Sequence, residues 1–205
     1  MPNKGNATKA KAKKVDRRVE RTRQLLSEAL VSLIREKGYE AMTVQDIIDR
    51  ANVGRSTFYT HFVDKDDLLL NGLQSLRTAL EQHQKLALRE SAPAEQRGFG
   101  FSQALFEHAD EQRETFRCVV GKRSGATIER HFRRMLVDLV REDVRAMTWR
   151  AVDGSPPLEA VVQYVAGGLV GLLAWWADGK MRLSIDEVSA LFRRLAVPAT
   201  KAALR

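Results

Sequence analysis

Residues 43–65 decide the fold of this chain and read Thr-Val-Gln-Asp-Ile-Ile-Asp-Arg-Ala-Asn-Val-Gly-Arg-Ser-Thr-Phe-Tyr-Thr-His-Phe-Val-Asp-Lys. After Thr43, apolar side chains recur at the i, i+3, i+4, i+7 spacing of one helix face: Val44, Ile47, Ile48 and Ala51. Thr43 stands where an N-cap hydroxyl accepts a hydrogen bond from a first-turn amide. The pattern therefore predicts a short helix that begins after Thr43.

A turn and a second helix follow. Asn52-Val53-Gly54 interrupts the apolar pattern with two residue types that tolerate turn conformations. In the next segment Phe58 and Phe62 are four residues apart and are expected to face the core. A neighbouring arc of this helix carries Arg55, Ser56, Tyr59 and Thr60. Two short helices joined by a tight turn predict a helix-turn-helix.

The chemistry of this arc suits duplex DNA. An arginine can bind a guanine edge through two hydrogen bonds, and short hydroxyls can reach bases or phosphates. Tyr59 and His61 can donate to phosphate oxygens, and the arc holds no acidic residue. The alternative interpretation is an ordinary helical hairpin with a solvated polar face.

The segment resembles the DNA-binding signature of TetR-family transcriptional regulators, and the resemblance is specific over residues 17–67. The matching residues are Thr43, Ile47, Ala51, Val53, Thr57, Tyr59, His61, Phe62 and Lys65. One position departs, because the family usually has Ser or Thr where this chain has Gly54. From the chemistry of the arc we expect Arg55, Ser56, Tyr59 and Thr60 to meet the major groove, with Arg55 reading a base. Together with the resemblance, it predicts that Thr57, His61 and Lys65 bind phosphates and that Thr43 belongs to the same DNA-binding surface.

Charge and cysteine content narrow the class further. The net charge is +8, and residues 1–23 hold nine Lys or Arg against Asp16 and Glu20. We expect residues 1–16 to be a basic, flexible arm that either solubilises the protein or binds DNA, by following phosphates or entering the minor groove beside the recognition helix. A single cysteine excludes an internal disulfide framework. With no apolar leader segment at the N-terminus, the sequence predicts a cytoplasmic protein.

Helical periodicity continues through the chain. Helices are predicted from Arg17 to Gly38 and from about Asp66 to Glu90, followed by two shorter ones that separate near Asp110. A helix over 126–148 turns its arginines outward, as a solvated face. Leu158–Ala177 is apolar, but Glu159 and Gln163 shorten its uninterrupted run, so a buried helix is preferred to a membrane span. Ser184 and Glu187 have capping-box spacing for a last helix, which Pro198 is expected to end.

These elements predict an all-α fold in two domains. Residues 17–63 form a three-helix DNA-binding domain, and residues 64–205 form a helical regulatory and dimerisation domain. Following the resemblance, we expect a repressor that binds a pseudo-palindromic operator as a homodimer and is released by a small apolar or amphipathic effector. The expected dimer interface comprises Gly167, Gly168, Gly171, Leu191, Phe192 and Leu195. The candidate effector pocket comprises Phe99, Phe101, Phe106, Phe116, Tyr164 and Trp175, although aromatic residues at helical spacing are more often plain core.

Other chemistries have little support in the sequence. Four histidines are scattered and there is no cysteine pair, so neither a metal site nor a cofactor is expected. Neither a Gly-x-Ser-x-Gly elbow nor a glycine-rich phosphate loop is found, which disfavours an enzyme. The remaining alternatives are an all-helical enzyme, a DNA-binding protein without an effector, and a protein that coats nucleic acid without sequence preference.

Overall fold

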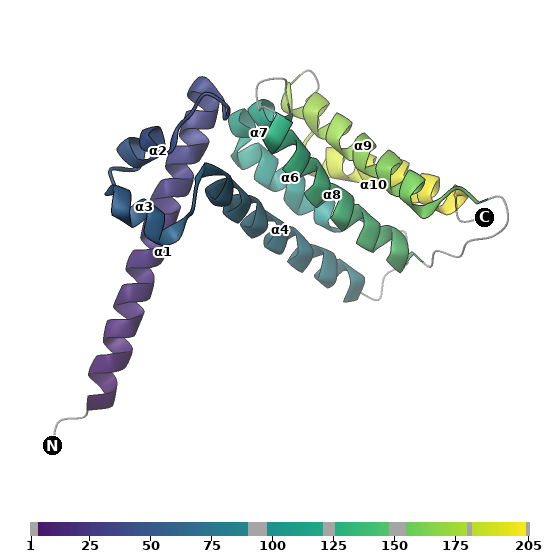
Figure 1. Ribbon diagram of the computed structural model, residues 1–205. Helices are drawn as coiled ribbons and strands as arrows, with labels where there is room; N and C mark the ends of the chain where they lie inside the picture. Colours follow the sequence, from purple (N-terminus) through teal and green to yellow (C-terminus); the bar gives the residue numbers. More distant parts are fainter. Residues whose placement is uncertain (1–3, 90–97, 121–125, 148–154, 180–181, 204–205) are drawn as a thin grey trace. The chain divides into compact units, whose positions relative to one another are not determined.

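The structure is a computed structural model that describes residues 4–89, 98–120, 126–147, 155–179 and 182–203, with side chains from residue 17 onward except at 88 and 118–120. All regular structure in these residues is helical, which confirms the predicted all-α class (Figure 1). The helices are α1 Lys4–Lys37, α2 Val44–Ala51, α3 Arg55–His61, α4 Lys65–Arg89, α6 Phe101–Glu111, α7 Arg113–Val120, α8 Ala126–Ala146, α9 Leu158–Ala177 and α10 Ile185–Ala202.

The chain divides into two compact units, here called the head (Met1–Gly72) and the body (Leu73–Arg205). The boundary lies inside α4, whereas the sequence placed it at residue 64, before that helix. The difference arises because the first turns of α4 belong to the head, where Leu68 and Leu69 are buried. The sequence-based boundary was set where the helix-turn-helix motif ends, and the motif alone does not show that the first turns of α4 pack in the head.

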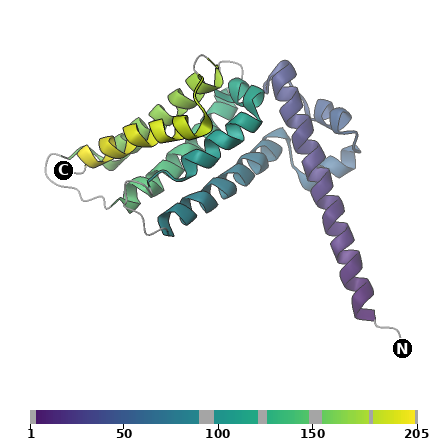
Figure 2. The same ribbon diagram turned by 180° about the vertical axis from the view of Figure 1, so that it is seen from behind.

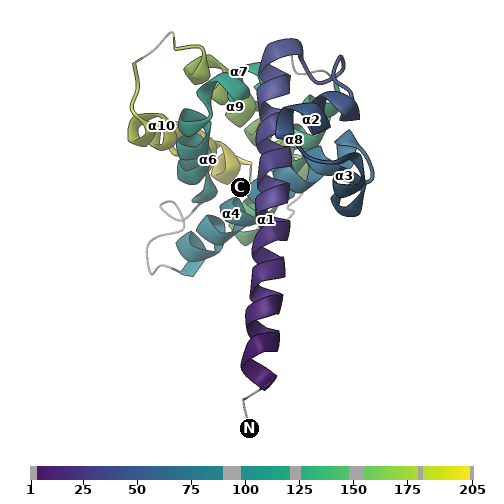
Figure 3. The ribbon, with the colours of Figure 1, turned by 90° about the vertical axis from the view of Figure 1, so that its left-hand side faces the viewer.

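The head is a three-helix unit. Figure 3 shows α2 and α3 lying against the C-terminal half of α1. The predicted apolar positions meet in one core, which comprises Leu26, Ala29, Leu30, Leu33, Ile34, Tyr39, Met42, Ile47, Ile48, Ala51, Phe58, Phe62, Leu68 and Leu69. Asn52 adopts a left-handed conformation with φ 49° at the end of α2, which makes the tight turn between α2 and α3.

The N-terminal helix is longer than expected. The sequence predicted a flexible arm over residues 1–16, but α1 begins at Lys4. Alanine and lysine are among the best helix formers, and no proline separates this segment from the helix over 17–37. A helix that has already nucleated can therefore extend toward the N-terminus.

The body is a bundle built around an apolar core. Viewed from behind, α9 and α10 lie along one side of the bundle, with α6 and α8 beneath them (Figure 2). The break between α6 and α7 falls at Gln112, two residues from the predicted position. As predicted, the arginines of α8 turn outward: Arg130, Arg133, Arg134 and Arg145 are exposed, and Arg141 is half-buried.

The last helix does not end at Pro198, and this prediction was wrong. α10 continues to Ala202 with the proline inside it. Proline removes one helical hydrogen bond, whose acceptor would be the carbonyl of Arg194. Arg194 and Pro198 are both exposed, so water can reach this face, while Val197 and Thr200 are buried and hold the last turns in place. Thr200 Oγ1 also donates to the Ala196 carbonyl at 2.8 Å.

α9 is long and apolar enough to cross a membrane by length and composition. One side of it is nevertheless core, since Val162, Val165, Leu169, Leu173 and Trp176 are buried. A core helix of a globular protein meets the same length and composition test, so this helix gives only weak support for a membrane span.

Candidate nucleic-acid interface

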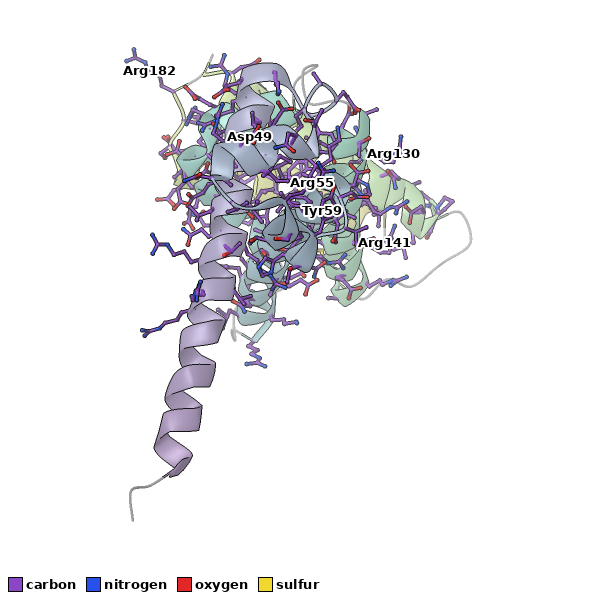
Figure 4. All side chains as sticks on the ribbon, turned by 60° about the vertical axis from the view of Figure 1, so that its left-hand side comes forward. Asp49, Arg55, Tyr59, Arg130, Arg141 and Arg182 are labelled. Carbon is purple, nitrogen blue, oxygen red and sulfur yellow. The ribbon has the colours of Figure 1, made fainter. Side chains whose placement is uncertain are left out.

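α3 presents a polar, acid-free face. Phe58 is fully buried and fixes the rotation of the helix, so Arg55, Ser56, Tyr59 and Thr60 are exposed together. Figure 4 shows Arg55 and Tyr59 on this face, and the Arg55 guanidinium carbon lies 5.7 Å from the Tyr59 ring centroid. Stacking on the ring limits the conformations of the guanidinium, which prepares it for a directional contact.

The N-terminus of α3 has no side-chain cap. Gly54 is the N-cap of α3 with φ −72° and makes no side-chain cap hydrogen bond. A Cβ built there would meet Thr57 Oγ1 at 3.5 Å, an ordinary contact, so the site accepts a serine sterically. The first-turn amides of α3 are thus left without a side-chain oxygen, and free amides at a helix N-terminus favour an anion.

The remaining predicted DNA contacts differ in how available they are. Thr57 and His61 are half-buried at the edges of the polar face. Thr43 is exposed, but its hydroxyl is engaged: it accepts from the Asp46 amide at 3.2 Å and donates to Asp46 Oδ2 at 2.7 Å. In the structure, the hydroxyl of Thr43 therefore serves as the N-cap of α2.

Lys65 is half-buried, and its ammonium group is engaged within the head. Its Nζ donates to the carbonyl oxygens of Tyr39 at 3.1 Å and Met42 at 2.9 Å. The same ammonium lies 4.7 Å from the centroid of the Tyr39 ring, whose hydroxyl donates to Asp66. Burial, together with the carboxylate of Asp66, raises the pKa of Tyr39 and keeps it a donor. Lys65 thus ties the start of α4 to the loop that precedes α2.

Two ion pairs that the sequence reasoning missed hold α2 against α1. Arg50 binds Glu36 through both guanidinium nitrogens at 2.6 Å, and Lys37 binds Asp46 at 2.7 Å. The Lys37 ammonium and Thr43 lower the pKa of Asp46, so this acid stays ionised beside the interface. The partners are far apart in sequence, so no local pattern could have revealed them. The ion pairs join α2 to α1 at the surface of the head, beside the buried contacts of Ile47, Ile48 and Ala51.

The residues predicted for the dimer interface gather on the α9–α10 side of the body. A Cβ added at Gly167, Gly168 or Gly171 would meet nothing within 4 Å, so this side of α9 is open. Tyr164 is 72% exposed and Leu195 is 63% exposed, both large apolar side chains. Between them lies a groove of about 180 Å³ that includes Gly168 and Leu172. Phe192 lines this groove but is itself buried, and Leu191 is half-buried.

The aromatic residues predicted to line an effector pocket do not form one surface here. Phe99, Phe101, Phe106 and Phe116 are buried members of the core, and Tyr164 is exposed on α9. Phe106 packs edge-on against Trp176 at 5.5 Å and Phe116 against Phe132 at 5.6 Å. Trp175 is only partly buried against the same core. Each phenylalanine already has aromatic or aliphatic partners, so the plain-core alternative fits these four residues in this conformation.

Comparison with known proteins gives consistent matches to both units. The family model described as bacterial regulatory proteins, tetR family, matches residues 26–71. A model described as transcriptional regulator C-terminal region matches residues 99–197. An uncharacterized HTH-type transcriptional regulator of Bacillus subtilis, YxbF, is 37% identical over 78 residues, which is 38% of this chain and 20% of that protein. The match therefore spans about a fifth of the relative's length.

Solved structures share the fold over nearly the whole chain. A TetR transcriptional regulator from Streptococcus agalactiae superposes with a TM-score of 0.65 at 23% identity, covering 90% of this chain and 98% of that one. A putative TetR-family regulator from Syntrophomonas wolfei gives a TM-score of 0.70 at 20% identity, covering 89% and 96%. At these identities the likeness concerns the fold.

Proposed function

This chain belongs to the tetR family of bacterial regulatory proteins and is a DNA-binding regulator of transcription, and from that premise we propose that it is a cytoplasmic repressor that binds a pseudo-palindromic operator as a homodimer and is released by a small effector. Regulators of this family bind DNA and are dimers. Repression and release by an effector are typical of the family. The observation that supports the DNA-binding part most directly is the polar, acid-free face of α3.

In this proposal Arg55 reads a base edge in the major groove and Ser56, Tyr59 and Thr60 contact bases or phosphates beside it. Exposure of all four from one short helix supports the assignment. Thr57 and His61, which are half-buried, contact phosphates in this proposal. The basic N-terminal segment of α1 adds phosphate contacts that do not depend on sequence.

The dimer forms through α9 and α10. The open glycine positions on α9 let a partner helix approach closely, and the exposed Tyr164 and Leu195 contribute apolar area. Such a contact is isologous, because the same surface serves both copies. Two-fold symmetry then requires recognition helices spaced by about 34–36 Å, or a multiple of it, and hence an operator with two related half-sites.

The effector binds in the body and changes the separation of the two α3 helices. α4 is the covalent link, since its 25 residues run without a break from the head into the body. At 1.5 Å per residue it is about 37 Å long, so a small tilt at one end becomes a larger displacement at the other. To drive release, the ligand must bind the two conformations with different affinity.

A two-step experiment tests this proposal. A thermal-shift screen of amphipathic and aromatic compounds identifies ligands of the purified protein, and operator affinity is then measured with each hit. We expect at least one hit to stabilise the protein and weaken operator binding. Hits that stabilise the protein while leaving operator affinity unchanged would contradict release by an effector and favour a body that only dimerises.

A further inference from the structure

One carboxyl group in the core of the body makes no hydrogen bond of normal geometry within the described residues. Asp143 on α8 is 1% exposed, and neither of its carboxylate oxygens accepts a hydrogen bond within the described part of the chain. Buried polar groups in native proteins are almost always hydrogen-bonded, because desolvation of an unpaired charge is costly. Such an orphan carboxyl needs a functional explanation.

A second buried polar group lies beside it. Gln84 on α4 is 5% exposed, and its amide nitrogen donates to the Leu139 carbonyl of α8 at 2.9 Å. The Gln84 amide and the Phe99 backbone N–H are near enough to favour the ionised carboxyl slightly, yet neither makes a hydrogen bond of normal geometry with it. Leu80 and Val140, one helical turn before Gln84 and Asp143, are both buried. Gln84 and Asp143 are therefore surrounded by buried apolar side chains.

The turn that contributes Phe99 is strained. Phe99 is fully buried with φ 59°, a left-handed conformation that bulky residues rarely adopt. Conformations of this kind cost free energy and are concentrated at binding and switching sites. A strained turn beside a buried carboxyl is therefore a candidate switching element.

The same turn is connected to the helix proposed to dimerise. The Phe99 ring packs edge-on against Phe192 of α10 at 5.6 Å. Ser102, whose amide donates to the Phe99 carbonyl at 2.9 Å, shares a buried hydrogen bond of 3.2 Å with Ser189 of α10. Phe192 in turn lines the groove with Leu195 on the α9–α10 side. The Phe99 turn is therefore coupled to α10 directly through Phe192 and indirectly through Ser102 and Ser189.

From this arrangement we propose that Asp143 and Gln84 are the polar anchor of the effector site, and that the effector is a protonated amine carried on an apolar or aromatic body. The inference rests on the proposed function, in which the body holds an effector. An ammonium group supplies the missing donors to the carboxylate through charge-assisted hydrogen bonds. A neutral ligand would leave the ionised form of Asp143 unpaired, and an anionic ligand would be repelled by it. Leu80, Phe99 and Val140 provide the apolar surroundings for the rest of the molecule.

The test uses the full-length protein and two matched probe pairs. Thermal shifts at pH 7.5 are measured with tryptamine against tryptophol and with 2-phenylethylamine against 2-phenylethanol, for the wild type, Asp143→Asn and Glu142→Gln. Glu142 is the exposed neighbour on α8, so its variant removes the same charge without touching the buried pair. We expect the amines to stabilise the wild type and Glu142→Gln, and Asp143→Asn to lose roughly tenfold or more of the amine affinity. In the wild type the effect should also fade at pH 5.5, where the carboxyl is protonated.

Each other outcome has a definite meaning. Amines that stabilise nothing, that act no better than the alcohols, or that stabilise Asp143→Asn equally would overturn the anchor. Operator affinity, measured in parallel, separates this inference from the proposed function. If an amine needs Asp143 to bind but leaves operator affinity unchanged, the amine site is supported and release of the operator by that ligand is contradicted. A different compound that releases the operator without needing Asp143 keeps the proposed function and refutes the site.

Discussion

The Nζ atom of Lys65 lies 3.1 Å from the carbonyl oxygen of Tyr39 and 4.7 Å from the centroid of the Tyr39 ring. Together with its 2.9 Å bond to the Met42 carbonyl, this contact closes the segment between α1 and α2 onto the start of α4. The resemblance to TetR-family regulators assigns Lys65 to a DNA phosphate. The structure gives its ammonium group an internal role that does not require DNA.

Lys65→Met should therefore destabilise the head even without DNA. Two carbonyls lose their donor, and each buried group left unpaired costs about 1–3 kcal/mol. Thermal and urea unfolding of the free protein measure this loss, with Lys85→Met, an exposed lysine on the same helix, as the control. Unchanged stability combined with a salt dependence of DNA binding reduced by about one unit would instead identify Lys65 as a phosphate ligand.

Local sequence patterns predicted the head well because its decisive features are local. The spacing of Val44, Ile47, Ile48 and Ala51 and the Asn52–Gly54 turn each depend on near neighbours, and the structure has the helices and turn where they were expected. The chemistry of the α3 face and the resemblance together supplied the DNA contacts, which remain predictions. The internal bonds of Lys65 could not be foreseen, because its acceptors are more than 20 residues away.

The body was predicted less completely. Helix positions followed from periodicity, but the roles of single residues depend on packing between distant helices. Asp143 illustrates this. In the sequence it is a single acid next to the apolar residues Leu139, Val140 and Val144, and only the structure shows that it is buried with them. Pro198 failed as a stop signal because a helix whose buried residues anchor it on both sides tolerates an exposed proline.

Deletion of residues 2–14 should weaken binding to any duplex and flatten its salt dependence. The segment is rich in lysine, and each lost phosphate contact lowers the slope of log K against log salt by about 0.9. Fluorescence anisotropy at several salt concentrations measures the slope, and circular dichroism checks that the head stays folded. An unchanged slope would assign the segment a solubilising role only.

Gly168→Trp should shift the protein from dimer to monomer. Gly168 faces open space on α9, so the bulky side chain fits the isolated chain but prevents close approach of a partner helix. Gly72→Trp is a matched control, because Gly72 is also a helical glycine with nothing within 4 Å of an added Cβ. Light scattering measures the mass of both variants. A dimeric Gly168→Trp protein would place the interface elsewhere.

Asp143→Asn should make stability less dependent on pH. Burial raises the pKa of Asp143 to about 7, compared with about 3.9 for an unfolded aspartate. Between these values the folded state binds more protons, so the contribution of Asp143 to stability is present at low pH and is lost as pH rises to about 7 and above. The full difference is on the order of 4 kcal/mol. Burial lowers the pKa of His108, so His108 makes stability rise with pH. This effect is the same in the wild type and Asp143→Asn, and it cancels when the two are compared.

We therefore expect Asp143→Asn to match the wild type near pH 4.5 and to exceed it in melting temperature at pH 8. Glu142→Gln, which changes an exposed carboxylate on the same helix, should follow the wild type at both pH values. If the stability of Asp143→Asn and of the wild type changes in parallel between these pH values, the surroundings of Asp143 already stabilise its ionised form, and the prediction is contradicted.

Selection of bound sequences from a random duplex library at physiological salt tests the central claim, that the chain reads DNA as a dimer through α3. The wild type is predicted to enrich one sequence with two inversely related half-sites, and Arg55→Ala to lose preference at one position in each half-site, at a cost of about 1–3 kcal/mol for that base pair. Arg182→Ala, an exposed arginine of the body, should enrich the wild-type sequence. Absence of any enriched sequence with the wild type, or an identical sequence preference for Arg55→Ala, would contradict this account.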